Sequence, residues 1–362
     1  MVSWNIVEVA AELRERAEAS GCTVLDLSAG TPTLPTPQVV QQALAAAADA
    51  PGYPATHGSA ALRQAYADWA GRAFAAALDP ELVLPTIGSK ELIAGLPALL
   101  GLGRDDLVVV PELSYPTYRL GAQRAGCRIL AADSLTALGP QRPRLVWLNT
   151  PGNPTGRVLG VPHLRKVLQW ARDRNALVAS DECYLELQPP GQRPVSILDP
   201  EVNDGELGNL LAVHSLSKRS AMAGYRVGFV SGDPSVVADL LALRRSLGLI
   251  VPGPIQAAAT AALNDDAHVA DAAAHYDRHR QVLRQALEAG GFRVDDSTAG
   301  LFVWASNGEE DVLVTRRLAE KGLVVAPGGF YGPTGAAHIR VALTANTSDT
   351  LAAADILRHF GD

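Results

Sequence analysis

The chain has 362 residues, of which 48% are hydrophobic and 19% are charged, a size and composition that suit two globular domains. Acidic residues outnumber basic ones by 38 to 31, so electrostatics gives no reason to expect a nucleic-acid-binding protein. Prolines or polar residues interrupt the longest apolar stretches, and we expect none of them to cross a membrane. The three cysteines lie far apart and glutamates interrupt the N-terminal apolar segment, which favours reduced thiols and a cytoplasmic location.

Short apolar runs alternate with helical patterns from about residue 82 onward. The runs predict strands at 82–87, 107–110, 128–131, 145–149, 177–180, 210–213 and 226–230. The intervening patterns predict helices at 91–100, 118–125 and 161–174. The strands show no polar alternation, so both of their faces should be buried. We therefore expect an α/β fold with a mostly parallel sheet flanked by helices.

The pattern changes after a long helical region at about 235–289. Shorter apolar runs then predict strands at 292–294, 301–304, 323–326 and 339–343, with helices between and after them. This order indicates a smaller α+β domain, which the N-terminal segment should join. We expect a large domain over 46–270 and a small domain made of 1–45 and 271–362.

Polar residues follow several predicted strands at the point where each strand ends. In parallel sheets these ends meet at one edge, where loops and helix N-termini converge. The residues in question are Gly88-Ser89-Lys90, the turn 149–156, Asp181 to Tyr184, and Ser215 to Lys218. We expect them to form one site.

Lys218 and Asp181 carry the most specific chemistry in this set. Only four of the 31 basic residues are lysines, and an amine, unlike a guanidinium, can lose its proton. Lys218 would therefore suit covalent chemistry with a carbonyl cofactor, although a solvated loop lysine is the alternative for Lys218 alone. A buried Asp181 would need a cationic partner such as the protonated ring nitrogen of pyridoxal 5′-phosphate, with helix capping as the alternative.

A phosphate group could be held beside these two residues. Arg226 and Ser215 lie on either side of Lys218 in the sequence, and Ser89 begins a helix after Gly88. A surface salt bridge is the alternative reading of Arg226. Asn153 in its rigid turn and Tyr184, three residues after Asp181, could both bind the phenolic oxygen of the cofactor ring.

Taken together, these motifs resemble the class I and II aminotransferases of PLP fold type I. The resemblance rests on Asn-Pro-x-Gly at 153–156, Asp-x-x-Tyr at 181–184 and Ser-x-Ser-Lys followed by Gly-Tyr-Arg-x-Gly at 215–228. Order and spacing agree from 25–32 to 338–343. The resemblance implies the two-domain fold of that family, pyridoxal 5′-phosphate as cofactor, ping-pong kinetics and a homodimer.

The resemblance also implies a role for individual residues. Lys218 would bond to the cofactor aldehyde, Asp181 would pair with the ring nitrogen, and Arg340 would grip the substrate α-carboxylate with help from the Gly30 backbone. The other expected cofactor contacts are Tyr115 stacked on the ring, Asn153 and Tyr184 at its hydroxyl, Tyr53 reaching the partner subunit's phosphate, and Gly88, Ser89, Lys90, Ser215 and Arg226 near the phosphate.

The substrate is indicated by a narrower resemblance. Stretches 85–93, 211–218 and 326–332 are most similar to actinobacterial N-succinyldiaminopimelate aminotransferases of lysine biosynthesis. This implies glutamate as amino donor and a succinylated keto acid as acceptor, both with a second anionic group. Lys90 is the candidate cation for that group, with a phosphate contact or an exposed lysine as alternatives. Ala221 and Leu34 depart from the family pattern and leave the substrate open.

Other activities and sites were weighed against this one. Another amino acid aminotransferase or a PLP-dependent C–S lyase would use the same scaffold, and a binding module without turnover could share the fold. His275 and His279 have i, i+4 spacing, but no third ligand is evident, so we expect no metal site. Cys183 is expected to be a packing residue.

Overall fold

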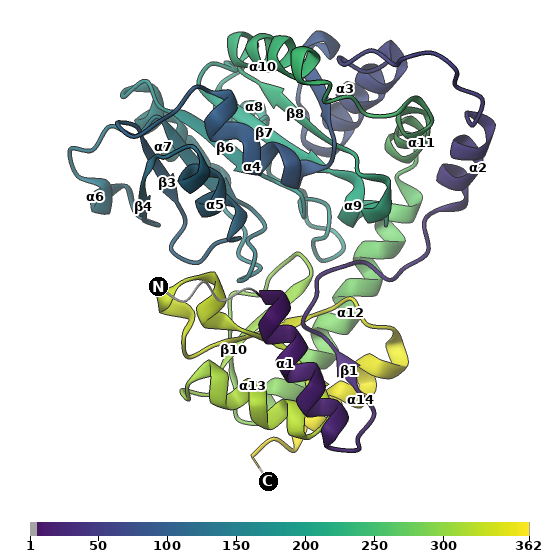
Figure 1. Ribbon diagram of the computed structural model, residues 1–362, viewed down its shortest axis with the longest axis vertical. Helices are drawn as coiled ribbons and strands as arrows, with labels where there is room; N and C mark the ends of the chain where they lie inside the picture. The colour runs from purple at the N-terminus through teal and green to yellow at the C-terminus, as the bar shows by residue number, and fades with distance from the viewer. Residues whose placement is uncertain (1–5, 362) are drawn as a thin grey trace.

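A seven-stranded sheet forms the centre of the upper body in Figure 1, in a computed structural model that describes residues 6–361. The strand order is β2-β8-β7-β6-β5-β3-β4, and β8 pairs antiparallel with both neighbours while the other pairs are parallel. The strands are β2 Val83–Thr86, β3 Leu107–Val110, β4 Arg128–Ala131, β5 Leu145–Asn149, β6 Leu177–Asp181, β7 Leu210–Ser215 and β8 Gly228–Gly232. The predicted α/β fold and mostly parallel sheet are confirmed.

Helices cover both faces of this sheet because its strands are apolar on both sides. In β7, Leu210 and Ala212 pack into one core while Leu211 and Val213 pack into another. The first core takes side chains from α3 (Ala60–Phe74), α7 (Val161–Arg172) and α11 (Gly253–Leu263). The second core takes them from α4 (Ser89–Leu99), α5 (Thr117–Arg124) and α10 (Pro234–Leu247).

The predicted helical region at 235–289 consists of three separate helices. α10 ends at Gly248, whose φ of 69° lies in the left-handed region that glycine adopts at little cost. Pro252 then precedes α11, and α12 (Ala267–Ala289) follows it. Gly248 and Pro252 are therefore the residues that interrupt the region. The remaining short helices of the upper body are α6 Leu135–Leu138, α8 Pro200–Asn203 and α9 Leu216–Arg219.

The lower body in Figure 1 is built on a four-stranded antiparallel sheet. Its order is β12-β13-β10-β9, and a separate parallel pair joins β1 of the N-terminal segment to β11. The elements are α1 Ile6–Ala19, β1 Leu25–Asp26, β9 Arg293–Asp295, β10 Phe302–Ser306, α13 Asp311–Glu320, β11 Leu323–Val324, β12 Ala326–Pro327, β13 Ile339–Ala342 and α14 Thr347–Arg358. The expected smaller α+β region is confirmed, and the N-terminal segment contributes β1, which pairs with β11.

Two helices, α2 and α12, lie at the boundary between the upper and the lower body. α2 (Gln38–Ala46) packs against α11 of the upper body, whereas α12 runs from the upper body into the lower one.

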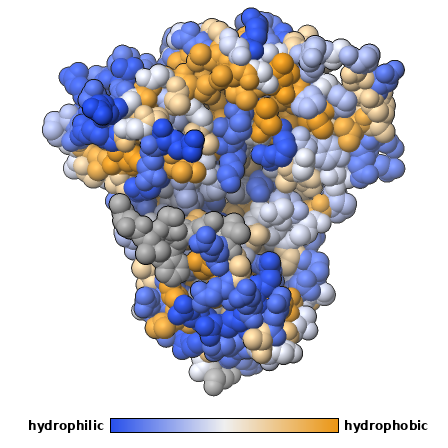
Figure 2. Space-filling model, in the orientation of Figure 1, coloured by the Kyte–Doolittle hydropathy of each residue, from blue (hydrophilic) through white to orange (hydrophobic). Residues whose placement is uncertain are grey.

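On the face drawn in Figure 2, apolar side chains gather mainly over the upper body. Between residues 6 and 361, no helix is long and apolar enough to cross a bilayer. The predicted small domain also includes 1–5 and 362, which lie outside the described residues.

Candidate active site

The ends of β5, β6 and β7 lie side by side at one edge of the large sheet. Asn149 pairs in register with Asp181, and Asp181 with Val213. Lys218 follows β7 on the short helix α9. The strand order therefore brings the predicted residues of the turn 149–156, of β6 and of α9 to one edge, as parallel pairing requires.

Lys218 presents its amine at this edge. Its Nζ donates a hydrogen bond to the carbonyl oxygen of Gly30, a residue of the N-terminal segment. Burial lowers the pKa of Lys218 to about 8, and the positive charges of Arg340 and Arg226 act in the same direction. About a tenth of the Lys218 side chains is therefore uncharged at pH 7, and the uncharged amine is the form that attacks a carbonyl.

Asp181 is a buried carboxylate, only 3% exposed, at the end of β6. The hydroxyl of Tyr118 donates to its Oδ2 over 2.6 Å, and the Cys183 backbone N–H donates to its Oδ1 over 3.2 Å. Burial raises the pKa of Asp181, although these hydrogen bonds oppose the shift. No basic side chain between residues 6 and 361 forms an ion pair with it. A cation at this position would stabilise the buried charge.

Arg226 and Gly88 form a cradle at the start of α4. Arg226 has a φ of 55° and donates to the Ala223 carbonyl oxygen over 2.9 Å. Gly88 has a φ of 73°, and a Cβ atom there would lie 2.4 Å from the guanidinium Nη2 of Arg226. Only glycine allows this approach. The guanidinium and the free N–H groups at the beginning of α4, with Ser89 its first residue, together suit a phosphate.

Arg340 joins the two bodies through Asn153. It lies on β13 of the lower body, and its Nη1 donates to Asn153 Oδ1 over 2.8 Å. Its Nη2 donates to the Ser28 carbonyl oxygen over 2.6 Å. Asn153 is in turn fixed by its backbone N–H, which donates to Asn149 Oδ1 over 2.7 Å. The guanidinium is thereby held in one orientation.

Aromatic rings also hold Arg340. Its Cζ lies 3.9 Å from the ring centroid of Phe302 and 4.8 Å from that of Tyr331. The Phe302 ring also explains Gly30, where a Cβ atom would lie 2.4 Å from it. A planar cation fixed between rings is suited to binding a carboxylate through two parallel hydrogen bonds.

The other predicted residues surround this group at longer range. Tyr115, in the loop after β3, has Lys90 Nζ 5.9 Å from its ring centroid. The buried Tyr184 packs edge-on against Phe302, with centroids 5.7 Å apart, and burial raises its pKa well above the usual value. Ser215 ends β7, and its Oγ accepts from the Ser217 backbone N–H over 3.2 Å. Lys90 is exposed.

Tyr53 is the predicted residue that the structure leaves outside this group. Its side chain is 99% exposed, in contrast to the buried or half-buried aromatic residues of the site. Within a single chain it contacts none of the residues above.

The residues at the sheet edge fit pyridoxal 5′-phosphate. The Lys218 amine, with its lowered pKa, suits the cofactor aldehyde. The buried Asp181 carboxylate suits the protonated ring nitrogen. The Arg226 guanidinium at the start of α4 suits the phosphate. The family model for aminotransferase class I and II matches residues 23–354. The chain belongs to this family. Its members depend on pyridoxal 5′-phosphate, so the aminotransferase described here does as well.

Relatives of the aminotransferase carry several names. It is 56% identical to a probable aminotransferase of Mycobacterium tuberculosis, over 95% of this chain and 82% of the relative. It is 50% identical to the 4-dedimethylamino-4-oxo-anhydrotetracycline transaminase OxyQ of Streptomyces rimosus, over 94% of each. A solved structure of a probable N-succinyldiaminopimelate aminotransferase from Thermus thermophilus matches with a TM-score of 0.89 and 28% identity, over 98% of this chain and 99% of that one.

Sequence reasoning missed residues that support the site. Tyr118 and the rings of Phe302 and Tyr331 contact the predicted residues, yet none was singled out, and Asn149 was included only as part of the turn 149–156. Tyr118 follows Tyr115 by three residues, a spacing that could have indicated it.

Two residues outside the predicted site are engaged in packing. His279 is buried, with its ring nitrogens near the Leu343 carbonyl oxygen and the Thr347 hydroxyl. Burial raises the pKa of the Cys183 thiol well above its usual value, so it remains protonated.

Proposed function

We propose that this aminotransferase moves an amino group between glutamate or 2-oxoglutarate and a second amino or keto acid, with Lys218 as the catalytic residue. The observation that carries the proposal is the Lys218 amine, whose pKa is lowered to about 8, at the same sheet edge as the unpaired carboxylate of Asp181. An amine that is readily deprotonated serves both covalent capture of the cofactor and proton transfer.

The chain's residues would hold the cofactor at three places. When bound, pyridoxal 5′-phosphate supplies an aldehyde that captures amines and a ring that withdraws electrons from them. Asp181, held by Tyr118, would keep the ring nitrogen protonated. Gly88, Ser89, Ser215 and Arg226 would bind the phosphate, with Lys90 close to them. Tyr115 would stack on the ring, and Asn153 and Tyr184 would bind its hydroxyl.

Arg340 would select the reaction by orienting the substrate. Its fixed guanidinium would bind the α-carboxylate, beside the Gly30 backbone, and so set which Cα bond faces Lys218. Once its amine is free, Lys218 would take the Cα proton as a general base and would return it, as a general acid, to the carbon that the cofactor aldehyde contributes. The two half-reactions would then give ping-pong kinetics.

For the acceptor we propose N-succinyl-2-amino-6-oxopimelate, as in lysine biosynthesis. Support comes from the Thermus thermophilus structure, whose name carries this activity, and from Lys90, an exposed cation beside Tyr115 that could meet the distal carboxylate. A second candidate is the amination of a ring ketone. The name of the 50% identical Streptomyces rimosus transaminase favours it. This relative is 50% identical to the chain, whereas the Thermus thermophilus protein is 28% identical, and this difference supports the second candidate.

A substrate panel tests these candidates. The purified holoenzyme is given glutamate as donor and a series of keto acids and ring ketones, including the succinylated pimelate, and both products are quantified. We expect the highest kcat/KM for the succinylated acid, with parallel lines in double-reciprocal plots. Release of free ammonia instead of amino-group transfer would point to a C–S lyase or related elimination.

Assembly and domain limits are further parts of the proposal. Tyr53, 99% exposed in one chain, would be covered by a second copy and reach its phosphate, which makes the enzyme a homodimer. We propose a cytoplasmic location. We propose a large domain over 46–270 and a small domain made of 1–45 and 271–362. Because α2 packs on α11, we move the first limit to Gln38, the start of α2.

A further inference from the structure

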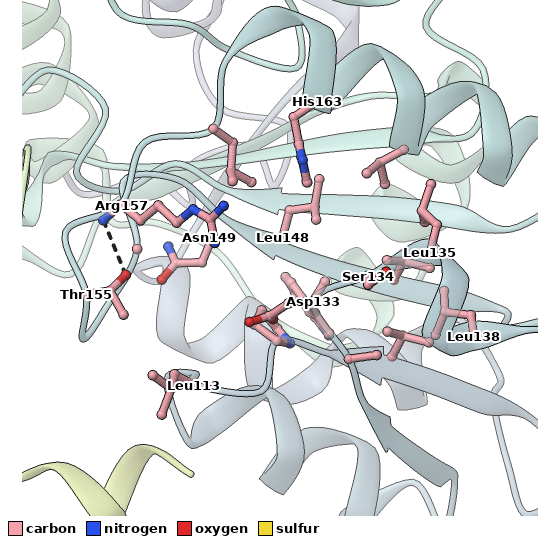
Figure 3. A pocket seen from close by; sticks show the side chains of 18 of the residues that line it. Leu113, Asp133, Ser134, Leu135, Leu138, Leu148, Asn149, Thr155, Arg157 and His163 are labelled. Carbon is pink, nitrogen blue, oxygen red and sulfur yellow. Dashed lines mark hydrogen bonds between the residues drawn. The ribbon is translucent and has the colours of Figure 1, made fainter. Parts of the chain in front are cut away.

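A pocket of about 340 Å³ lies on the α7 side of the large sheet, and neither Lys218 nor Arg340 lines it. Its walls come from the ends of β3 and β5, the segment of α6, the turn after Asn149 and the first turns of α7. Figure 3 shows this pocket with its side chains. Its volume falls within the range of small-molecule sites, about 300–1,000 Å³. None of the residues proposed to bind cofactor or substrate lines it.

One end of the pocket is apolar. Leu138 and Val146 are buried here in a small core, with Leu135 packed against them. Leu148 continues this surface toward the middle of the pocket (Figure 3). Leu135 and Leu148 keep part of their surface accessible. A ligand that covered them would remove apolar surface from water, at roughly 25 cal/mol per Å².

The pocket lining also carries charges of both signs. The side chains of Arg157 and Lys166 form no ion pair or hydrogen bond with any residue from 6 to 361. Asp133 uses only Oδ1, which accepts from the Glu112 backbone N–H over 2.9 Å. Asp296, from the lower body, also lines the pocket.

His163 lies among these charges. Burial lowers the pKa of His163, and the positive charges of Arg157 and Lys166 act in the same direction, while Asp133 opposes them. The ring is therefore mainly neutral near pH 7. With His163 neutral, the two cations and the two carboxylates of the pocket give no net charge. A net anion would gain from the cations but face Asp133 and Asp296, whereas a zwitterion can satisfy both signs.

We propose that this pocket binds an α-amino acid with an apolar side chain. Its carboxylate would face Arg157 and Lys166, its ammonium group the free oxygen of Asp133, and its side chain the surface of Leu135 and Leu148. The site is separate from the proposed catalytic function and does not depend on it. It adjoins that function through Asn149, whose amide lines the pocket and donates to the Asp181 carbonyl oxygen over 2.9 Å.

The probe for this site is α-methyl-L-leucine, which has no Cα hydrogen and cannot be transaminated. Its binding to the holoenzyme is measured by saturation-transfer NMR, and the cofactor absorbance reports any binding at Lys218. Two truncated probes, 4-methylpentanoate and 3-methylbutylamine, each lack one charged group. We expect the amino acid to bind at least threefold more tightly than either, without a change in cofactor absorbance.

Variants locate the site. Arg157→Ala with Lys166→Ala removes two exposed cations, and because each exposed ion pair is weak this should reduce binding roughly 2–30-fold. Arg142→Ala with Arg144→Ala removes two exposed arginines outside the pocket and should change nothing. Ala132→Trp should fill the pocket and abolish binding, with transaminase activity retained in all three variants.

Several results would overturn the proposal. Equal binding by both double variants, or binding that survives Ala132→Trp, would show that the amino acid binds elsewhere. Equal binding of 4-methylpentanoate would show a site for organic anions rather than zwitterions. A probe signal that tracks a cofactor absorbance change would place the binding at Lys218 instead.

Discussion

Replacing Tyr118 with Phe tests how the chain controls the charge of Asp181. The substitution removes one O–H donor, 2.6 Å from Asp181 Oδ2, and keeps the ring that stacks on Trp147 with centroids 4.9 Å apart. Tyr118 is fully buried and Asp181 is 3% exposed, so water cannot easily replace the lost bond. A hydrogen bond to a charged group contributes about 1.5–3 kcal/mol.

That free energy becomes a pKa change because the bond stabilises the carboxylate over the acid. One pKa unit corresponds to about 1.4 kcal/mol, so the pKa of Asp181 should rise by about 1–2 units. A higher pKa means that the carboxylate is lost at a higher pH as the solution is acidified. The acid limb of the kcat profile should therefore move up by about 1–2 pH units.

The assay is the pH dependence of kcat with the best donor and acceptor, in Tyr118→Phe and in a matched control. Tyr276→Phe serves as the control because Tyr276 is buried in the lower body and its hydroxyl has no partner between residues 6 and 361. We expect the control to keep the wild-type profile. An acid limb that stays in place in Tyr118→Phe, with its thermal stability unchanged, would refute the proposed role of this hydrogen bond.

Three further outcomes are expected. Lys218→Ala should abolish the yellow colour and transamination, whereas Lys321→Ala should keep both; a coloured, active Lys218→Ala protein would exclude Lys218 as the bonding residue. In cofactor-free protein the rate of covalent capture of pyridoxal 5′-phosphate, followed by stopped-flow absorbance, should rise with pH through about 8, because deprotonation frees the Lys218 amine; a rate that is flat between pH 6 and 9 would contradict the lowered pKa. Gly88→Ala should displace the Arg226 guanidinium and weaken cofactor binding roughly 10–100-fold. Gly101→Ala should leave cofactor binding unchanged, because Gly101 also has a positive φ but a Cβ atom there would have no atom within 4 Å. Similar cofactor dissociation constants for the two variants would count against the phosphate cradle.

The sequence predicted the large sheet well because its strands are short, uninterrupted apolar runs that end in polar residues. Strand β8 was the exception, since we expected it to begin at Arg226, whereas it begins at Gly228. Arg226 adopts a φ of 55° instead, in the turn that directs its side chain to Gly88. Apolar periodicity carries no information on such a turn. The breaks between α10, α11 and α12 were missed for another reason, because Gly248 and Pro252 were not used as end signals.

The site could be predicted only as far as chain order and strand ends allow. Asp181 and the turn at 149–156 follow neighbouring strands, so their proximity follows from a parallel sheet. The contact between Arg340 and Asn153 joins residues 187 positions apart in different bodies, and no local pattern encodes it. Tyr118 was missed because it lies inside a predicted helix rather than at a strand end. Contacts of this kind depend on packing between elements.

The scarcity of lysine gives the buried amine of Lys218 a practical consequence. Amine-selective labelling reagents could react with only four lysine side chains in this sequence. Lys90 and Lys166 are exposed, whereas Lys218 donates to the Gly30 carbonyl oxygen. Mass spectrometry of the labelled protein, with and without cofactor, would thus measure the labelling of the Lys218 peptide beside only three other lysine-containing sites. The same scarcity makes the enzyme convenient for site-directed attachment to solid supports, because coupling through surface amines would leave few alternative orientations.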